Sequence, residues 1–117
     1  RYGHLCGDDV LRAFAATVNA AIRPYDIFGR YGGEEFLLIS VATEARGASA
    51  MVERLLEQMR STPVTHEGAS VSVTFSCGLA DTAEYPPGRL DVDALVGLAD
   101  RRLYEAKSMG KDRLVGP

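Results

Sequence analysis

The chain has 117 residues, which is enough for one domain with a single packed core. Its hydrophobic fraction is 46% and its charged fraction 25%, as in ordinary globular proteins, and no apolar run approaches the ~20 residues of a membrane-spanning helix. The net charge of −3 argues against a general nucleic-acid binder, because such a protein needs a basic surface. A small phosphorylated ligand needs only a few local cations and stays compatible with this charge.

The two cysteines, Cys6 and Cys77, have neither metal-binding spacing nor the density of a disulfide framework. Reduced thiols in a cytoplasmic domain are the simpler interpretation, and no signal-peptide pattern opens the chain. The chain starts without a methionine, a few residues before an expected helix. We therefore expect it to be part of a longer protein, with any membrane anchor in an upstream domain.

The first expected element is a helix. Residues 1–7 read as a loop, and Asp8 or Asp9 is positioned to cap a helix that runs to about Ile22, since apolar residues recur there at helical spacing. Pro24 disfavours helical geometry in the residue before it and ends the helix.

A hairpin follows. Strands are expected over Asp26–Tyr31 and Glu35–Val41, with Gly32-Gly33 as the turn. The run Phe36–Ile39 is apolar on both faces of a pleated strand, so we expect this strand to be central in its sheet.

The remaining elements alternate in type. We expect a helix over Glu44–Arg60, capped by Thr43, and then a short edge strand over Val64–His66. A half-buried strand is expected over Val71–Leu79, where apolar and polar residues alternate. A helix capped by Asp91 or Asp93 follows and ends near Ser108, and Arg113–Val115 is expected to form a closing strand. This order predicts an α/β (α+β) domain with an antiparallel hairpin, and it matches half of a ferredoxin-like unit. On that plan another strand precedes Arg1.

The hairpin turn carries the first candidate site. Glycines let a backbone approach a bulky anion, and carboxylates such as Glu34 and Glu35 can hold the divalent ion that the anion carries. On a pleated strand these two side chains point to opposite faces. The alternative is an exposed Gly32-Gly33 turn with two solvated glutamates.

Other polar residues gather at the ends of elements. For Asp8, the alternative to a role in ligand binding is that it caps the helix that follows. For Arg23 and Asp26, the alternative is a plain surface ion pair. Lys107 and Lys111 lie at the end of a helix, where cations complement the helix dipole in any protein. If the chain is an enzyme, carboxylates and terminal lysines fit metal-assisted phosphoryl or nucleotidyl transfer best.

Several segments, taken together and in order, resemble the GGDEF family of diguanylate cyclases over the whole chain. The matching segments are Gly3-His4-x-x-Gly7-Asp8-x-x-Leu11, Arg23-x-x-Asp26, Arg30-Tyr-Gly-Gly-Glu-Glu-Phe36, Val73-Thr-Phe-Ser-Cys-Gly78, Ala99-Asp-x-x-Leu103-Tyr-x-Ala-Lys107 and Gly110-Lys-Asp-Arg113. Enzymes of this family join two GTP molecules into cyclic di-GMP and release two pyrophosphates, on a ferredoxin-like palm related to nucleotide cyclases. The resemblance implies a mostly antiparallel central sheet flanked by helices.

The resemblance also implies roles for single residues. Gly32 and Gly33 would admit the GTP phosphates, and Glu34 would bind Mg²⁺ or Mn²⁺. Glu35 would support the metal site and the activation of the ribose 3′-hydroxyl. Further substrate contacts would come from Asp8, at the guanine edge, and from Lys107 and Lys111, at the phosphates.

A second site is implied by Arg23-Pro-Tyr-Asp26, which matches the R-x-x-D product-inhibition motif of the family. Arg23 and Asp26 would bind cyclic di-GMP there, and Arg54 falls where the family has a secondary product contact. Each domain would hold one GTP, so catalysis would need a homodimer.

The family's first strand, with a metal-binding Asp in a D-x-D-x-F-K pattern, and the following Asn-Asp pair are not in this chain. A second metal ligand and a guanine contact are therefore expected upstream of Arg1. The alternative function is a non-catalytic receptor that binds cyclic di-GMP through Arg23 and Asp26.

Overall fold

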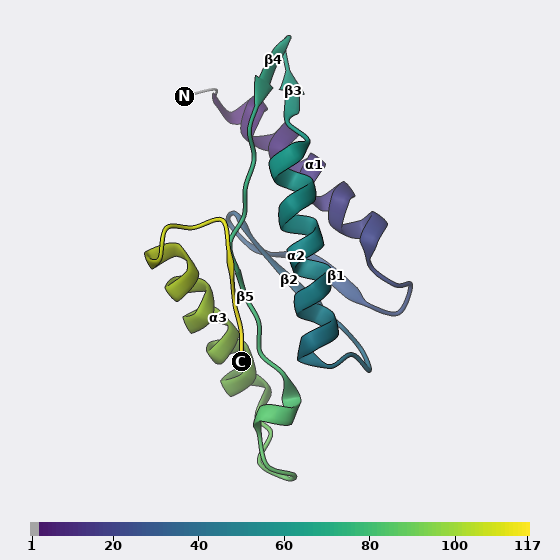
Figure 1. Cartoon of the computed structure of the whole chain (residues 1–117), viewed down its shortest axis with the longest axis vertical. Coiled ribbons are helices and arrows are strands. Elements are labelled where there is room, and N and C mark those ends of the chain that lie inside the picture. Colours follow the sequence, from purple (N-terminus) through teal and green to yellow (C-terminus); the bar gives the residue numbers. More distant parts are fainter. Residues whose placement is uncertain (1–2) are drawn as a thin grey trace. The chain divides into compact units, whose positions relative to one another are not determined.

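The computed structural model describes residues 3–117, with side chains from Gly7 onward. Helices and strands alternate along the chain (Figure 1), in the order α1 (Gly3–Ala21), β1 (Ile27–Gly32), β2 (Glu35–Ile39), α2 (Ala45–Ser61), β3 (Val64–His66), β4 (Ala69–Val71), β5 (Cys77–Gly78), the 3₁₀ helix η1 (Thr82–Glu84), α3 (Val92–Ser108) and β6 (Leu114–Val115). The described strands pair two by two: β1 with β2 and β3 with β4 antiparallel, and β5 with β6 parallel.

The chain forms two compact units. One contains residues 1–43 and 57–73, and the other contains residues 44–56 and 74–117, so that α2 contributes residues to both. Each unit has its own buried apolar residues and is described by itself.

Aromatic packing holds the first unit together. Phe14 of α1 lies 5.1 Å from Phe36 of β2 and 6.2 Å from Phe28 of β1, measured between ring centroids. The rings of Phe28 and Phe36 stack at 5.3 Å, because both side chains lie on the same face of the hairpin. Val18 and Met59 are almost fully buried in this unit. These contacts fix the hairpin against α1.

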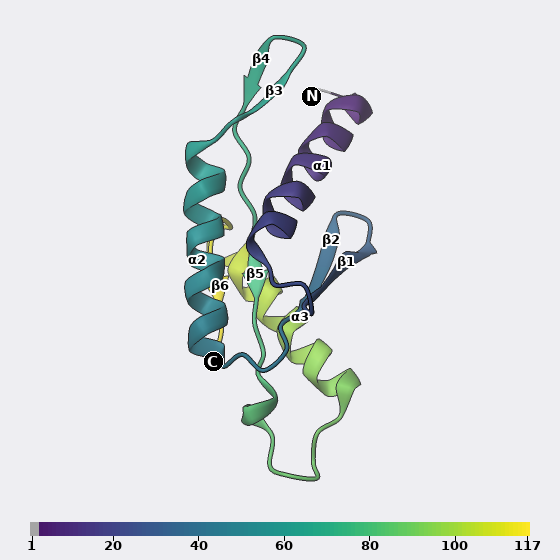
Figure 2. The same cartoon turned by 90° about the vertical axis from the view of Figure 1, so that its right-hand side faces the viewer.

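Close packing of α3 on β5 organises the second unit. Figure 2 shows α3 beside β5 and β6. Gly78 makes this approach possible, since a Cβ atom there would lie 2.0 Å from the Ala99 carbonyl oxygen and 2.3 Å from the Leu103 nitrogen. Ala106 of the same helix is fully buried.

Asp81 and Glu84 order the loop between β5 and α3. Asp81 accepts from Ala83 N and Glu84 accepts from Asp81 N, which makes a capping box around η1. Asp81 also accepts from Ala45 N at the start of α2. Arg102 of α3 donates two hydrogen bonds to Glu84, of 2.6 and 2.8 Å, and the pKa of that carboxyl lies below its ordinary value because of them.

Several predicted elements are confirmed within a few residues: the hairpin, α2, the edge strand β3, α3 with its Asp91 cap, and β6. The predicted loop is wrong over residues 3–7, because α1 begins at Gly3, and its first two residues lie outside the described part of the chain. No proline interrupts this segment, and each residue added to an existing helix gains a hydrogen bond that offsets the glycine penalty of about 1 kcal/mol. Asp8 and Asp9 therefore lie inside the helix and do not cap it.

The predicted strand Val71–Leu79 is wrong in its middle. Val71 ends β4 and Cys77 begins β5, while residues 72–76 form no ladder. The alternating pattern does predict burial, since Val73 and Leu79 are buried. An alternation of apolar and polar residues predicts which side chains are buried. A β-ladder also needs a neighbouring strand to which the backbone can form hydrogen bonds.

Candidate functional site at the hairpin and helix termini

The hairpin turn differs by one residue from the expected one. Gly32 still belongs to β1 and pairs with Glu35, so Gly33 and Glu34 are the two loop residues. Gly33 has a φ of +54°, which suits the first position of a primed hairpin turn and favours glycine there. Because Glu34 lies in the loop, the strand pleat does not separate it from Glu35 as expected.

Arg30 braces this turn. The ladder register shifts between Arg30 and Gly32, which leaves Tyr31 as an unpaired, bulged residue. From the strand, the Nε of Arg30 donates a 2.7 Å hydrogen bond to the carbonyl oxygen of Gly33. Arg30 thus stabilises the turn by bonding to the Gly33 backbone, and this bond does not involve the Glu34 carboxylate.

The two carboxylates differ in exposure. Glu34 is exposed at the turn and Glu35 is half-buried beside it. In the part of the chain that the structure describes, no three His, Cys, Asp or Glu side chains form a metal-binding group. Mg²⁺ commonly uses one or two protein carboxylates together with substrate phosphates, so the donor set of this turn fits such an ion.

Arg23 and Asp26 are brought together at the base of the hairpin. Arg23 donates to the Asp26 carboxylate through its Nε (3.3 Å), Nη2 (3.2 Å) and backbone N (3.0 Å), and Val41 N donates to it at 3.2 Å. The Asp26 side chain is only 2% exposed. The side-chain and backbone hydrogen bonds from Arg23 hold the pKa of Asp26 below its ordinary value.

The other contacts of Arg23 join the two ends of the hairpin. Its Nη2 donates to the carbonyl oxygen of Val41 at 2.7 Å and to the hydroxyl of Thr43, and its guanidinium lies 4.7 Å from the ring centroid of Tyr25. The predicted capping role of Thr43 is replaced by this contact, and by a hydrogen bond from its hydroxyl to the Val41 carbonyl. Arg23 remains 40% exposed, so it can still meet a ligand.

Lys107 and Lys111 lie at the C-terminal end of α3 in the second unit. Lys111 N donates to the Ala106 carbonyl at 2.9 Å, and Gly110 N donates to the Lys107 carbonyl at 3.4 Å, which together form a Schellman-type end. Lys111 is exposed, and its ammonium group forms no hydrogen bond or ion pair with the residues that the structure describes.

The other predicted site residues are spread over the helices. Asp8 is exposed on α1. Its neighbour Asp9 accepts from His66 Nδ1 at 2.5 Å and from Arg12 at 2.7 Å, and these bonds lower the pKa of Asp9. Arg54 is exposed on α2, in the second unit. Asp8 and the hairpin thus lie in one unit, and Arg54 and the two lysines in the other.

A family model described as "Diguanylate cyclase, GGDEF domain" matches residues 1–113. The chain belongs to the GGDEF family. It is 36% identical over 112 residues to diguanylate cyclase DgcZ of Escherichia coli, covering 96% of this chain and 36% of that protein. It is 37% identical over 118 residues to the response regulator PleD of Caulobacter vibrioides, covering 98% of this chain and 25% of the relative. The chain therefore spans about a third or less of these relatives.

Solved GGDEF structures have the same fold. Diguanylate cyclase SiaD of Pseudomonas aeruginosa, in complex with its activator SiaC, matches with a TM-score of 0.87 and 35% identity over 98% of this chain and 43% of that one. The GGDEF domain of DgcB from Caulobacter crescentus, in complex with c-di-GMP, matches with a TM-score of 0.88 and 27% identity over 97% of this chain and 64% of that one. This GGDEF chain is accordingly an α+β domain of the nucleotide-cyclase palm type.

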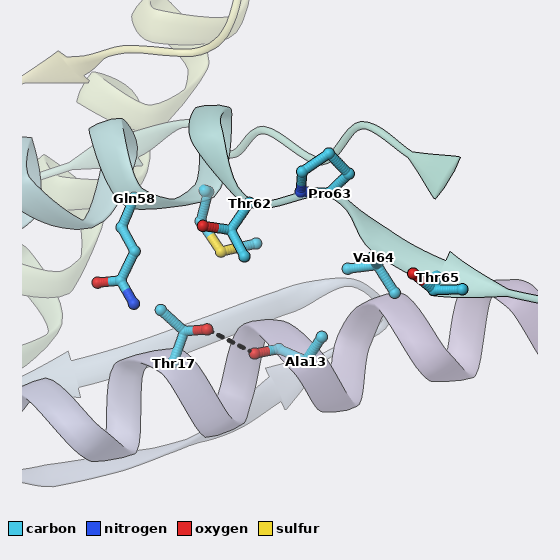
Figure 3. Close-up of a pocket in the computed structure, with 8 residues that line it drawn as sticks. Ala13, Thr17, Gln58, Thr62, Pro63, Val64 and Thr65 are labelled. Atoms are coloured by element: carbon cyan, nitrogen blue, oxygen red, sulfur yellow. Dashed lines mark hydrogen bonds between the residues drawn. The ribbon is translucent and has the colours of Figure 1, made fainter. Parts of the chain in front are cut away.

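A cavity of ≈ 280 Å³ has none of the predicted site residues in its lining. It is formed by α1, the end of α2 and β3 (Figure 3), and its lining is Ala13, Thr17, Gln58, Met59, Thr62, Pro63, Val64 and Thr65. The Thr17 hydroxyl donates to the Ala13 carbonyl, so one polar group of the cavity lining already has a partner.

Within the described part of the chain, no helix has the length and hydrophobicity needed to cross a bilayer.

Two residues at these sites escaped the sequence-based predictions. Thr43 was expected only as a helix cap, and Arg30 only as part of the hairpin motif. Arg30 donates to the Gly33 carbonyl oxygen, and Thr43 contacts both the Val41 carbonyl oxygen and the Arg23 guanidinium. A contact to a backbone carbonyl leaves no side-chain partner in the sequence. The nearest signal was the short spacing between Arg30 and the glycine turn.

Proposed function

We propose that this GGDEF domain synthesises cyclic di-GMP from two GTP molecules with release of two pyrophosphates. The observation that carries the proposal is the Gly33-Glu34 turn, a braced hairpin tip that offers an exposed carboxylate in a chain matched by the family model over residues 1–113. Relatives over nearly the whole chain are named diguanylate cyclases, which supports the same reaction.

At the hairpin, the absence of side chains on Gly32 and Gly33 lets nucleotide phosphates reach the backbone. Among the described residues, only the chain neighbours of each glycine lie within 4 Å of the position that its Cβ atom would take. Glu34 would hold Mg²⁺ or Mn²⁺ together with the phosphates, and Glu35 would support that site. The metal ion, when bound, lowers the pKa of the attacking 3′-hydroxyl and offsets charge on the leaving pyrophosphate.

Substrate contacts away from the hairpin complete the proposal. Asp8 would accept hydrogen bonds from the guanine edge, which is consistent with its exposure on α1. Lys107 and Lys111 would neutralise the phosphates from the end of α3. Each domain would bind one GTP, so the two halves of the product come from two copies of the domain in a homodimer.

We further propose product inhibition through Arg23 and Asp26, with Arg54 as a secondary contact. The geometry gives the two motif residues different parts. Arg23 is 40% exposed and would bind a phosphate or the guanine edge, whereas the Asp26 side chain is 2% exposed and holds the guanidinium in place. A direct contact between Asp26 and guanine would require Arg23 to turn away first.

The synthesis is tested by incubating the full-length protein with GTP and Mg²⁺ or Mn²⁺ and quantifying cyclic di-GMP by chromatography. We expect Glu34→Ala to abolish product, and Glu44→Ala, which removes an exposed carboxylate before α2, to leave it unchanged. Absence of product from the wild-type protein, or equal rates for wild type and Glu34→Ala, would overturn the proposal.

The second candidate function is a non-catalytic receptor for cyclic di-GMP. It is favoured by the ordered Arg23–Asp26 cluster, which does not depend on the hairpin tip. A wild-type protein that binds cyclic di-GMP and forms none from GTP would select the receptor over the enzyme.

A further inference from the structure

The turn that carries Lys111 has an unusual backbone. Gly110, Lys111 and Asp112 have φ values of +116°, +64° and +51°. Glycine is the ordinary residue after a helix end, but two successive residues with side chains in this region are costly and persist only when their surroundings hold them. Something beyond the end of α3 must therefore stabilise Lys111 and Asp112.

The structure shows what holds the turn. Arg113 Nε donates a 3.0 Å hydrogen bond to the carbonyl oxygen of Lys111. The guanidinium also lies over Gly110, whose Cβ position is 3.1 Å from Arg113 Nη2. One half-buried side chain thus covers the first residue of the turn and bonds to the second.

Arg113 is itself anchored. Its carbonyl oxygen accepts from Cys77 N at 2.9 Å, at the point where the β5–β6 ladder begins. On the other side, Lys111 N donates to the Ala106 carbonyl in the last turn of α3. The Lys111 backbone is therefore held between a helix end and a strand pair, with Arg113 as the link to the strands.

From this arrangement we infer that Arg113 is a positioning residue, which holds the left-handed turn so that the exposed Lys111 ammonium group meets the phosphates of bound GTP. This inference rests on the proposed function of Lys111. Arg113 acts through the carbonyl oxygen of Lys111, so its geometry as a hydrogen-bond donor matters more than its positive charge.

Two replacements separate geometry from charge. In Arg113→Gln, the amide nitrogen is the same number of bonds from Cα as the arginine Nε, so a neutral donor can reach the Lys111 carbonyl. In Arg113→Lys, the charge remains but a methylene occupies that position. Arg113→Ala removes both, and Arg101→Ala, at an exposed arginine of α3, is the matched control for loss of a charge.

The experiment uses the full-length protein and measures kcat and KM for GTP in all four variants, together with the dissociation constant of a non-hydrolysable GTP analogue. We expect Arg113→Ala and Arg113→Lys to raise KM and weaken analogue binding about tenfold with kcat nearly unchanged, as when a ground-state contact of about 1.4 kcal/mol is lost. Arg113→Gln and the Arg101→Ala control are expected to resemble wild type.

A merely structural role for Arg113 would lower the active fraction without moving KM, and would be visible as a lower unfolding midpoint in Arg113→Gln as well. The inference is overturned if Arg113→Lys restores KM and Arg113→Gln does not, or if Arg113→Ala binds the analogue as wild type does. If the wild-type protein forms no cyclic di-GMP, the proposed synthesis fails, and the analogue affinities still decide the role of Arg113. A wild type that binds no analogue overturns both.

Discussion

Replacement of Gly78 by alanine tests how α3 is held in the second unit. An added Cβ atom would lie 2.0 Å from the Ala99 carbonyl oxygen, 2.3 Å from the Leu103 nitrogen and 2.9 Å from the Arg102 carbonyl carbon. All three are backbone atoms of one helix, so no side-chain rotation relieves the clash. The whole helix would have to move away from β5.

The size of the effect follows from the kind of atoms involved. Overpacking of a core costs about 1–3 kcal/mol, and rigid backbone neighbours place this variant at the upper end, about 3 kcal/mol. Gly97 of α3 is a matched control, since among the described residues only its chain neighbours and the backbone of its own helix come within 4 Å of its Cβ position. Gly97→Ala should stabilise the domain by up to about 1 kcal/mol, because alanine favours a helix interior.

The assay is urea unfolding followed by circular dichroism, with an identical protocol for wild type and both variants. With a typical slope of about 2 kcal/mol per molar urea, the midpoint should fall by about 1.5 M in Gly78→Ala and rise slightly in Gly97→Ala. A Gly78→Ala midpoint within about 0.3 M of wild type would refute the close contact between β5 and α3.

Three further outcomes are expected. Hydrogen bonds from Arg23 lower the pKa of Asp26 below 3.8, so the stability that they give is present above that pH and is lost as the pH falls through the lowered pKa. Asp26→Asn should therefore flatten the pH dependence of the unfolding midpoint below pH 3.8. Parallel curves for wild type and variant would contradict this. Burial raises the pKa of Cys77 to about 11, so little thiolate forms at pH 8 on this half-buried residue. In a Cys6→Ser background a thiol reagent should therefore react much more slowly with the folded protein than with the urea-unfolded protein, and equal rates would disprove this. Arg23→Ala should weaken cyclic di-GMP binding in calorimetry by about tenfold or more, since a charge-assisted contact is lost, and an unchanged dissociation constant would remove Arg23 from the site.

Local patterns were enough to predict most of the secondary structure. Helical spacing of apolar residues predicted α2 and α3, and the glycine pair between apolar runs predicted the hairpin. The errors share one cause. The extent of a strand and the start of a helix depend on neighbouring backbones, as residues 72–76 and the segment from Gly3 show.

Motifs in the sequence predict a set of candidate site residues, whose roles stay predictions, but they do not predict the contacts that these residues make. An ion pair between Arg23 and Asp26 was the alternative to a product site, and the structure shows the two side chains paired. Their binding of cyclic di-GMP stays a prediction. The same pattern could not reveal that the Asp26 side chain is almost fully buried. Val41 N, distant in the sequence, donates to that carboxylate, and the Arg23 side chain that also bonds to it is held by the Val41 carbonyl oxygen and the Thr43 hydroxyl. Burial of a polar group follows from tertiary packing, and motif spacing does not encode it.

The two compact units brace the turns that carry Glu34 and Lys111 in the same way. In the first unit, Arg30 Nε donates to the Gly33 carbonyl, and in the second, Arg113 Nε donates to the Lys111 carbonyl. Each bond crosses a turn with positive φ values and leaves the neighbouring Glu34 or Lys111 side chain exposed. A turn that is ordered before the ligand arrives loses less conformational entropy on binding, so both arginines should improve affinity for GTP without touching it.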